Sequence, residues 1–247
     1  MLNMKQGIFE IIQNEPLTAS VYRMTLAGDT SAITAPGQFV NIRLSGKFLR
    51  RPISVCDWED GKLTLVYKVV GHGTAQMAAM APGEHLDLLT GLGNGYDLTL
   101  AGGTPLLVGG GVGVPPMYGL AKRLRALGTP VQVILGFNTK EEIFYEQEFK
   151  HLGCAVTVTT ADGSYGVKGF VTDAMKDLSY SHFCACGPEP MLKALYKASV
   201  TSGQLSFEER MGCGFGACMG CSCKTLTGSK RICKEGPVMK KEEILWD

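Results

Sequence analysis

The feature that most constrains the fold of this 247-residue chain is a cluster of cysteines near its C-terminus. Four of its nine cysteines lie within eleven residues, at positions 213, 218, 221 and 223, and Cys233 follows closely. Residues 205–247 are rich in Gly, Cys and Lys and are too few to form an apolar core of their own. A metal centre or a neighbouring domain must therefore hold this segment folded.

The spacing of these cysteines indicates an iron–sulfur cluster. Cys213, Cys218 and Cys221 form the pattern Cys-x4-Cys-x2-Cys, which with a later fourth cysteine is the plant-type [2Fe–2S] spacing. The interspersed glycines let the backbone wrap tightly and direct N–H groups at sulfide. Zinc sites more often have two Cys-x2-Cys pairs with a longer gap. Either Cys223 or Cys233 can be the fourth ligand, and a loop returning from a separate segment favours Cys233.

Residues 1–100 have the pattern of short antiparallel strands. Residues 39–44 and 63–70 are rich in β-branched and aromatic side chains with partial alternation, and turn-forming Pro-Gly and Asp-Gly pairs separate such runs. One helical stretch interrupts them at about residues 74–80. We predict a small antiparallel β-barrel for residues 1–100.

Residues 101–204 instead alternate strands with helices. The predicted strands cover residues 105–108, 131–135, 155–159 and 182–186. The predicted helices cover residues 114–127, 141–151 and 189–199. This alternation predicts an α/β domain whose parallel sheet has helices on both faces, followed by a small cluster domain at residues 205–247.

Charge and hydropathy exclude several other classes of protein. The formal net charge is +1, so no strong field attracts nucleic acid or an anionic membrane. No run approaches the about 18 apolar residues of a membrane span, and charged residues interrupt the N-terminal segment where a signal peptide would be apolar. We expect a cytoplasmic protein.

Two segments in the barrel half suit the phosphates of a dinucleotide. Arg51-Pro-Ile-Ser54 begins a predicted strand, and Gly71-His-Gly-Thr74 lies between the next strand and a helix. A guanidinium group binds pyrophosphate with two parallel hydrogen bonds. Backbone N–H groups at a glycine-rich helix start bind phosphate. Together the two segments predict a clamp for a dinucleotide cofactor.

A third glycine-rich segment, Gly109-Gly-Gly-Val-Gly-Val-Pro-Pro116, follows a strand and begins a helix. It departs from the Rossmann pattern because residue 114 is Val, and two prolines occupy the first helical turn. The position still favours binding of a pyrophosphate. After the next strand, residues 136–140 contain Lys140 but no arginine for a 2′-phosphate, which favours NAD over NADP.

Six motifs in the same order resemble those of the ferredoxin–NADP reductase superfamily. With the cysteine loop included, the chain resembles electron-transfer subunits of NAD-dependent (class B) dihydroorotate dehydrogenases over nearly its whole length. The six motifs are Arg51-Pro-Ile-Ser54, Gly71-His-Gly-Thr74, Gly91-Leu-Gly-Asn-Gly95, Gly109-Gly-Gly-Val-Gly-Val-Pro-Pro116, Cys186-Gly-Pro-Glu-Pro-Met191 and Glu208-Glu-Arg-Met-Gly-Cys213.

The resemblance implies the positions of the binding residues. FAD would contact Arg51, Pro52, Ile53, Ser54, Val66, Tyr67, Lys68, Gly73 and Thr74. The pyridine nucleotide would bind at Gly109, Gly110, Gly111 and Gly113, with Cys186 near the nicotinamide as the catalytic residue. The implied cluster ligands are Cys213, Cys218, Cys221 and Cys233. Ile53 departs from the wider superfamily, in which many members have an aromatic residue stacked on the flavin.

The resemblance also implies an activity. Electrons from dihydroorotate oxidation, in a partner subunit that contains FMN, would pass through the [2Fe–2S] cluster and FAD to NAD⁺, in pyrimidine biosynthesis. Two copies of each subunit would form a heterotetramer. Two alternatives are a related NAD(P)H:ferredoxin or sulfur-reducing oxidoreductase subunit with the same cofactors, and a non-catalytic module that zinc stabilises.

Overall fold

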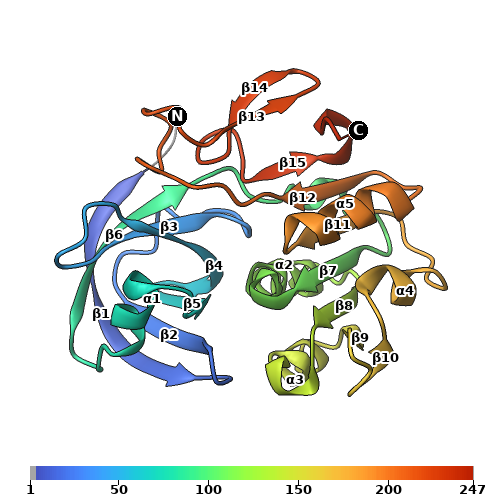
Figure 1. The fold of residues 1–247 in the computed structure, drawn as a ribbon, viewed down its shortest axis with the longest axis horizontal. Helices are drawn as coiled ribbons and strands as arrows, with labels where there is room; N and C mark the ends of the chain where they lie inside the picture. The colour runs from blue at the N-terminus through green and yellow to red at the C-terminus, as the bar shows by residue number, and fades with distance from the viewer. Residues whose placement is uncertain (1–3, 247) are drawn as a thin grey trace.

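Strand pairing divides the computed structural model, which describes residues 4–246, into a closed barrel and a mostly parallel sheet (Figure 1). The barrel strands pair antiparallel in the order β1-β2-β5-β4-β3-β6. They are β1 (Lys5–Pro16), β2 (Val21–Ala27), β3 (Phe39–Arg43), β4 (Arg51–Glu59), β5 (Lys62–Lys68) and β6 (His85–Leu92). The antiparallel barrel predicted for this half is therefore confirmed.

Alternation along β3 explains how the barrel packs. Val40 and Ile42 point inward and are fully buried in the barrel core. Phe39 and Asn41 point to the opposite side, and both are also buried because the C-terminal segment covers this outer surface. Helix α1 (His72–Ala78) packs Met77 into the barrel core. One strand of the barrel thus faces two different cores.

The second sheet has the order β10-β9-β8-β7-β11-β12-β15, and every neighbouring pair is parallel except β12 with β15. Its strands are β7 (Leu106–Gly110), β8 (Gln132–Phe137), β9 (Ala155–Thr160), β10 (Val167–Lys168), β11 (Phe183–Cys186), β12 (Gly203–Ser206) and β15 (Val238–Lys240). The helices are α2 (Val114–Ala126), α3 (Glu146–His151), α4 (Val171–Met175) and α5 (Glu189–Ala198).

Helices cover both faces of this sheet, as predicted. On β7, Leu107 packs with Leu120 of α2 on one face, whereas Leu106 packs with Leu192 of α5 on the other. Gly128 ends the α2 segment in the left-handed region at φ +80°. A strand with both faces buried is a continuous apolar run in the sequence, which made β7 easy to predict.

The prediction of one continuous helix over residues 141–151 is wrong. Residues Lys140–Glu142 form a short 3-10 turn, and α3 begins only at Glu146. Tyr145 lies in the left-handed region at φ 68°, which interrupts the helical path. Its ring is instead packed edge-on against Tyr118 of α2. Tertiary packing therefore outweighs the local helical pattern here.

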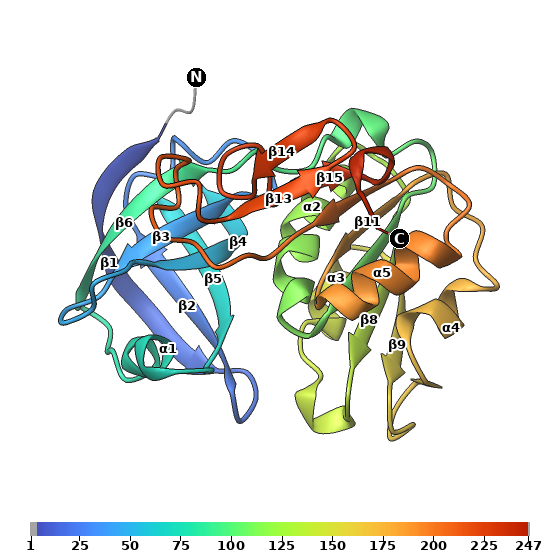
Figure 2. The same ribbon diagram turned by 45° about the horizontal axis from the view of Figure 1, so that its top comes forward.

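The C-terminal segment lies across the junction of the two lobes (Figure 2). It contains the hairpin β13 (Ser222–Thr225) with β14 (Gly228–Arg231), and its strand β15 pairs with β12. Cys221 and Cys233 are buried in the same apolar cluster as Phe39 of the barrel and Phe183 of the sheet. Both neighbouring lobes thus supply the core that this segment lacks.

The remaining regular elements are the 3-10 turns η1 (Leu98–Leu100), η2 (Gly111–Gly113), η3 (Lys140–Glu142) and η4 (Lys241–Glu243). Within residues 4–246, no helix is both long enough and apolar enough to cross a bilayer.

Replacing Leu205 by Ala should destabilise the fold strongly. The side chain is fully buried where the sheet meets the C-terminal segment, so we expect a loss of about 2–5 kcal/mol in the free energy of unfolding. The matched control is Leu226→Ala, because Leu226 is 63% exposed and should change stability by less than about 0.5 kcal/mol. Urea denaturation measures both, and equal losses would contradict the packing described.

Candidate functional site

The site begins with the contact between strand β4 of the barrel and helix α2 of the α/β lobe. One apolar cluster runs without a break from Cys56 and Val66 of the barrel to Val114 and Met117 of α2. Gly119 permits this approach, since a Cβ atom there would lie 2.4 Å from the carbonyl oxygen of Cys56. The two lobes therefore meet through packed side chains and backbone.

The two predicted phosphate-binding segments of the barrel lie against each other. A Cβ atom at Gly73 would lie 2.3 Å from Nε of Arg51, so the glycine provides the space that the guanidinium occupies. The Thr74 hydroxyl accepts a hydrogen bond from the Val70 N–H at 2.9 Å and fixes the turn. Arg51 and Ser54 remain partly exposed at the start of β4. This arrangement fits a dinucleotide cofactor.

The other residues predicted to contact FAD lie on strands β4 and β5, where successive side chains point to opposite sides and so lie in different surroundings. Tyr67 is buried in the barrel core and donates a hydrogen bond to Oδ1 of Asn14 at 3.0 Å, so only its backbone can face a ligand. Burial raises the pKa of Tyr67. Val66 faces the α/β lobe, and Lys68 is exposed. Ile53 is partly buried and packs against the barrel core. Pro52 is partly exposed on the same strand.

The glycine-rich turn before α2 meets the turn that follows β11. A Cβ atom at Gly113 would lie 2.1 Å from the carbonyl oxygen of Cys186, and one at Gly110 would lie 2.4 Å from Sδ of Met191. Gly109 similarly leaves room for Val114. Gly111 has φ +51° and nothing near its Cβ position, which leaves its surface open.

The position of these turns in the sheet supports a nucleotide site. Strands β8 and β9 lie on one side of β7, and β11 and β12 lie on the other. The connections therefore reverse direction between β7 and β11. Ligands of open α/β sheets bind at this switch point, beyond the carboxyl ends of the strands. Both turns lie at those ends.

Cys186 lies at the carboxyl end of β11 and is partly accessible. Burial raises the pKa of its thiol to about 12, against a smaller opposing effect of a hydrogen bond with Ser206. The thiol therefore stays protonated at neutral pH and can position a ligand by shape or weak hydrogen bonding, rather than act as a thiolate nucleophile.

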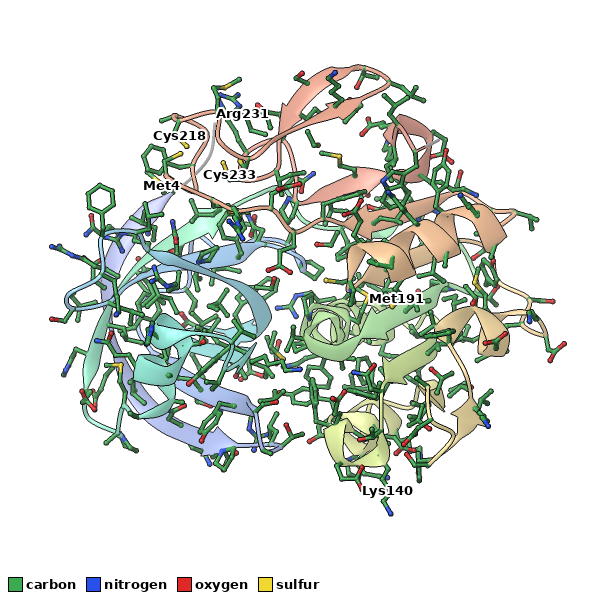
Figure 3. All side chains as sticks on the ribbon, viewed as in Figure 1. Met4, Lys140, Met191, Cys218, Arg231 and Cys233 are labelled. Carbon is green, nitrogen blue, oxygen red and sulfur yellow. The ribbon has the colours of Figure 1, made fainter. Side chains whose placement is uncertain are left out.

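Lys140 lies at the outer end of the α/β lobe (Figure 3). Two carboxylates follow it in the sequence. Glu141 lies 3.9 Å from Nζ of Lys140, and Glu142 accepts hydrogen bonds from the backbone N–H and Nδ2 of Asn138. A carboxylate after the second strand of such a sheet suits ribose hydroxyls and repels a 2′-phosphate. This arrangement favours NAD over NADP.

The cysteine loop brings its thiols together in two pairs. The Sγ of Cys213 accepts hydrogen bonds from the N–H groups of Ala217 at 3.2 Å and Cys218 at 3.4 Å, and the Cys213 N–H donates to Sγ of Cys218 at 3.5 Å. The Cys233 N–H donates to Sγ of Cys221 at 3.4 Å. A bound iron–sulfur cluster is stabilised by backbone N–H groups that donate hydrogen bonds to its sulfur atoms, and these N–H groups already point at the cysteine sulfurs.

No three His, Cys, Asp or Glu side chains among residues 4–246 surround a single ion position. A two-iron cluster divides its four ligands between two irons, so pairs of thiols are the expected arrangement. Gly214 at φ +80° and Gly216 at φ +90° give the loop its tight path. The donor set therefore fits a [2Fe–2S] cluster better than one tetrahedral metal ion.

Cys223 lies apart from these pairs. It belongs to β13, where Lys230 is its register partner, and it is partly buried against the apolar cluster. Burial, with a smaller effect of the nearby Glu209, raises the pKa of its thiol. Cys233, which was favoured as the fourth ligand, is the residue whose backbone contacts the Cys221 sulfur. The geometry favours Cys233 over Cys223.

Asn41 joins the cysteine loop to the barrel. Its Nδ2 donates to the carbonyl oxygen of Cys213 at 3.2 Å, and Gly214 lacks the Cβ that would clash with this nitrogen. Asn41 is also the register partner of Pro52 in the Arg-Pro-Ile-Ser segment. The cysteine loop therefore lies one strand away from the predicted FAD motif. Sequence analysis missed Asn41, because one asparagine in a strand gives no distinctive pattern.

Arg231 is a second residue that sequence analysis missed. Its Nη1 donates to the carbonyl oxygen of Gly216 at 2.6 Å, and its guanidinium is paired with Glu235. Figure 3 shows Arg231 beside Cys218 and Cys233 above the barrel. The hydrogen bond to Gly216 thus holds the cysteine loop from the side of the β13–β14 hairpin, and the ion pair with Glu235 orients the guanidinium. An arginine in a lysine-rich segment gave no signal of this role.

Two family models match the chain. Residues 208–245 match the iron–sulfur cluster binding domain of dihydroorotate dehydrogenase B, and residues 107–197 match the oxidoreductase NAD-binding domain. The first contains all the cluster cysteines, and the second contains the glycine-rich turn and Cys186.

Full-length relatives are also similar. A protein of Geobacillus sp. (strain WCH70), named dihydroorotate dehydrogenase B (NAD(+)), electron transfer subunit, is 43% identical over 256 residues, which cover 98% of this chain and 99% of the relative. A Fusobacterium nucleatum subsp. nucleatum protein of the same name is 44% identical over 248 residues, which cover 94% of this chain and 95% of the relative.

Solved structures share the fold. The NADH-dependent reduced ferredoxin-NADP oxidoreductase structure, described for flavin-based electron bifurcation, aligns with a TM-score of 0.88 and 32% identity over 98% of this chain and 91% of that one. A ferredoxin NADP⁺ reductase from Neisseria gonorrhoeae with bound FAD and NADP has a TM-score of 0.69 at 19% identity, over 78% of this chain and 90% of that one. The second likeness concerns the fold alone.

The contact between Gly73 and Arg51 predicts a specific defect. Gly73→Ala should displace the guanidinium and weaken FAD binding by about tenfold or more, the equivalent of one lost charge-assisted hydrogen bond. Gly103→Ala is the control, because nothing lies within 4 Å of its Cβ position. Fluorescence titration of the apoprotein with FAD measures both affinities, and equal affinities would place the phosphates elsewhere.

Proposed function

The chain belongs to the family of dihydroorotate dehydrogenase B electron transfer subunits, and from this premise we propose that it couples dihydroorotate oxidation in a partner catalytic subunit to reduction of NAD⁺. It is a flavin- and iron–sulfur-dependent oxidoreductase subunit. One observation supports the proposal most: within one chain, the FAD motif contacts the cysteine loop through Asn41 and the nucleotide lobe through β4 and α2.

The residues of this chain would hold each cofactor as follows. Arg51 would bind the FAD phosphates beside Gly73 and Thr74, and Ser54 would lie near the flavin ring. Pro52, Ile53 and residues 66–68 would line the rest of the site. When bound, FAD converts between hydride transfer and one-electron transfer, and the iron–sulfur centre supplies one-electron transfer.

The nucleotide site follows from the two turns at the switch point. Gly109, Gly110, Gly111 and Gly113 would let the pyrophosphate approach the backbone at the start of α2. The protonated Cys186 would border the nicotinamide. For the cluster, we propose Cys213, Cys218, Cys221 and Cys233 as ligands, supported by the paired sulfur contacts.

The partner would be a catalytic subunit that contains FMN, in a cytoplasmic heterotetramer with two copies of each subunit. We keep residues 1–100, 101–204 and 205–247 as the FAD, nucleotide and cluster domains. The proposed boundary after residue 204 falls within β12, and the pairing of β15 with β12 attaches the cluster segment to the sheet.

Dihydroorotate-dependent reduction of NAD⁺ by the co-purified complex tests the function. We expect activity that requires both subunits, and Cys218→Ala should reduce it at least a hundredfold by removing one cluster ligand. The chain alone should still oxidise NADH with an artificial acceptor.

A chain that holds FAD and iron but never couples to dihydroorotate would contradict the proposal. It would favour a related NAD(P)H:ferredoxin oxidoreductase subunit, which shares this fold at 32% identity.

The fourth cluster ligand has its own test. Cys233→Ser should lower the iron content of the purified chain and remove the visible absorption of the cluster, because Cys233 lies beside Cys221. Cys223→Ser should keep about two irons per chain, since Cys223 lies apart in β13. Iron analysis and visible spectra of both variants decide the matter, and the reverse pattern would make Cys223 the ligand.

A further inference from the structure

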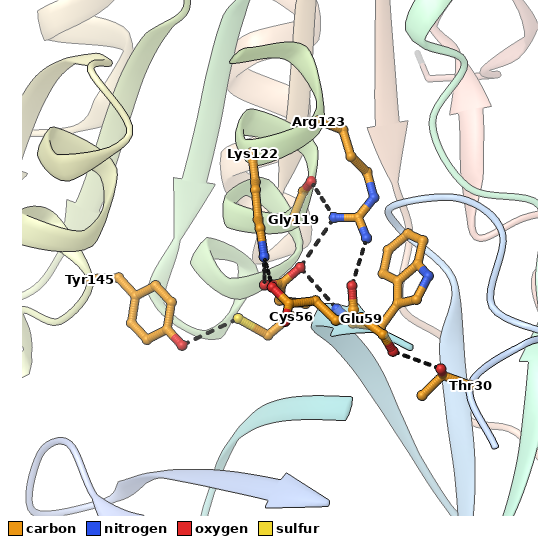
Figure 4. A network of polar contacts seen from close by, with 9 residues as sticks. Thr30, Cys56, Glu59, Gly119, Lys122, Arg123 and Tyr145 are labelled. Atoms are coloured by element: carbon orange, nitrogen blue, oxygen red, sulfur yellow. Dashed lines mark hydrogen bonds and ion pairs between the residues drawn. The ribbon is translucent and has the colours of Figure 1, made fainter. Parts of the chain in front are cut away.

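A second group of contacts, all polar, joins β4 to α2 further along both elements (Figure 4). Asp57 accepts a hydrogen bond from Nζ of Lys122 at 2.6 Å and from Nη1 of Arg123 at 3.2 Å. Glu59 accepts one from Nζ of Lys122 at 2.8 Å. We call the residues Asp57, Trp58, Glu59, Lys122 and Arg123 the β4–α2 clasp.

Two side chains of the clasp are largely buried, and several contacts hold them in place. The side chains of Asp57 and Arg123 are only 15% and 23% exposed. The guanidinium carbon of Arg123 lies 3.3 Å from the centroid of the Trp58 ring, and Nη2 donates to the Trp58 carbonyl oxygen at 3.2 Å. Its Nη1 also donates to the carbonyl oxygen of Gly119 at 3.1 Å. A planar group stacked and hydrogen-bonded in this way has one orientation.

The clasp connects the two elements that begin at the cofactor sites. Strand β4 begins at Arg51, in the FAD motif, and reaches the clasp at Asp57. Helix α2 begins directly after Gly113, in the nucleotide turn, and reaches the clasp at Lys122. Any sliding of α2 along β4 would therefore change the distance between the two sites.

Two further contacts stiffen the same interface. Gly119 lies against the Cys56 carbonyl oxygen, one residue before Asp57. The Cys56 thiol donates to the hydroxyl of Tyr145 at 3.4 Å, and Tyr145 keeps a strained left-handed backbone at φ 68°. Apolar packing alone resists separation more than sliding. The polar clasp fixes the register of the two elements, because its hydrogen bonds are directional.

We propose that the β4–α2 clasp is a positioning device that sets the spacing of the flavin and nicotinamide sites for hydride transfer. The inference rests on the proposed function, in which reduced flavin gives a hydride to NAD⁺ and one proton to solvent. The test follows the reverse reaction, in which NADH and one solvent proton reduce FAD to FADH₂ and leave NAD⁺. Among residues 4–246, the hydrogen bonds and ion pairs of the clasp side chains reach no residue proposed for either site, so the clasp would act through the placement of β4 and α2. Small displacements of reacting groups lower such rates steeply.

A purely stabilising clasp would give a different result from a positioning clasp. Loss of a purely stabilising contact lowers the unfolding temperature and leaves the rate of hydride transfer in the folded protein unchanged. Loss of a positioning contact slows hydride transfer at saturating NADH, while the affinities for NADH and FAD are retained. The rate constant at saturation and the dissociation constant therefore separate the two roles.

The test uses the purified, FAD-loaded chain with Asp57→Asn, which keeps the shape of the side chain and removes its charge. The matched control is Asp173→Asn, because Asp173 pairs with Lys176 at 2.8 Å on α4, away from the clasp. Stopped-flow absorbance measures flavin reduction by NADH. We expect the rate constant at saturation to fall about tenfold for Asp57→Asn and less than twofold for the control. The NADH dissociation constant should change less than twofold in both.

Two further variants extend the rate measurement, and hydrogen exchange adds a readout that does not depend on flavin reduction. Arg123→Lys keeps the charge but loses the stacked plane, so its rate should lie between those of the wild type and Asp57→Asn. Gly119→Ala should push α2 away from β4 and give the same separation of rate from affinity. Hydrogen exchange of the α2 backbone should be faster in Asp57→Asn than in Asp173→Asn, with FAD bound and NADH absent.

Equal saturated rates for Asp57→Asn and Asp173→Asn, in chains that bind FAD and NADH normally, would overturn the clasp proposal alone. A wild-type chain that binds no FAD, or whose flavin NADH does not reduce, would overturn the proposed function and the clasp proposal with it.

Discussion

The close packing of helix α2 on strand β4 is the contact on which the arrangement of the molecule depends. Gly119 allows the helix to approach the strand, and the apolar cluster from Val66 to Met117 closes the interface. Because β4 begins in the predicted FAD motif and α2 begins at the glycine-rich turn, one interface would place the two proposed binding sites. The rest of each lobe supports these two elements, the barrel by surrounding β4 and the parallel sheet by carrying the turn at its switch point.

The cysteine loop shows how a segment without its own core becomes ordered. Cys221 and Cys233 are buried against residues of both lobes, and Asn41 anchors the loop beside the predicted FAD motif. Oδ1 of Asn41 is buried and has no hydrogen-bond partner among the described residues, which ordinarily costs stability. The amide is kept at a cost of about 1–3 kcal/mol, and its other end holds the loop that would contain the cluster. Strand β15 then attaches the end of the segment to the sheet.

Local patterns predicted much of this structure, and tertiary contacts decided the rest. The doubly covered sheet was predictable because buried strands are continuous apolar runs. The turn at residues 109–113 was predictable from its run of glycines, of which Gly109, Gly110 and Gly113 make room for close neighbours. The break at Tyr145 was not, since the ring is held by a distant helix. Asn41, Arg231 and the Asp57–Lys122 pair also escaped notice, because ordinary polar residues acquire a role only when folding brings distant segments together. The cysteine spacing was the exception, as metal ligation leaves a pattern in sequence itself.

We propose that the nucleotide, flavin and iron–sulfur sites of this single chain exchange electrons with one another. Anaerobic titration of the purified chain with NADH, followed by visible absorption and electron paramagnetic resonance, tests it most directly. We expect loss of the flavin absorption together with the resonance of a reduced [2Fe–2S] cluster in the same sample. Loss of flavin absorption while the cluster stays oxidised in excess NADH would contradict it, since the cysteine loop would then not exchange electrons with the flavin beside it.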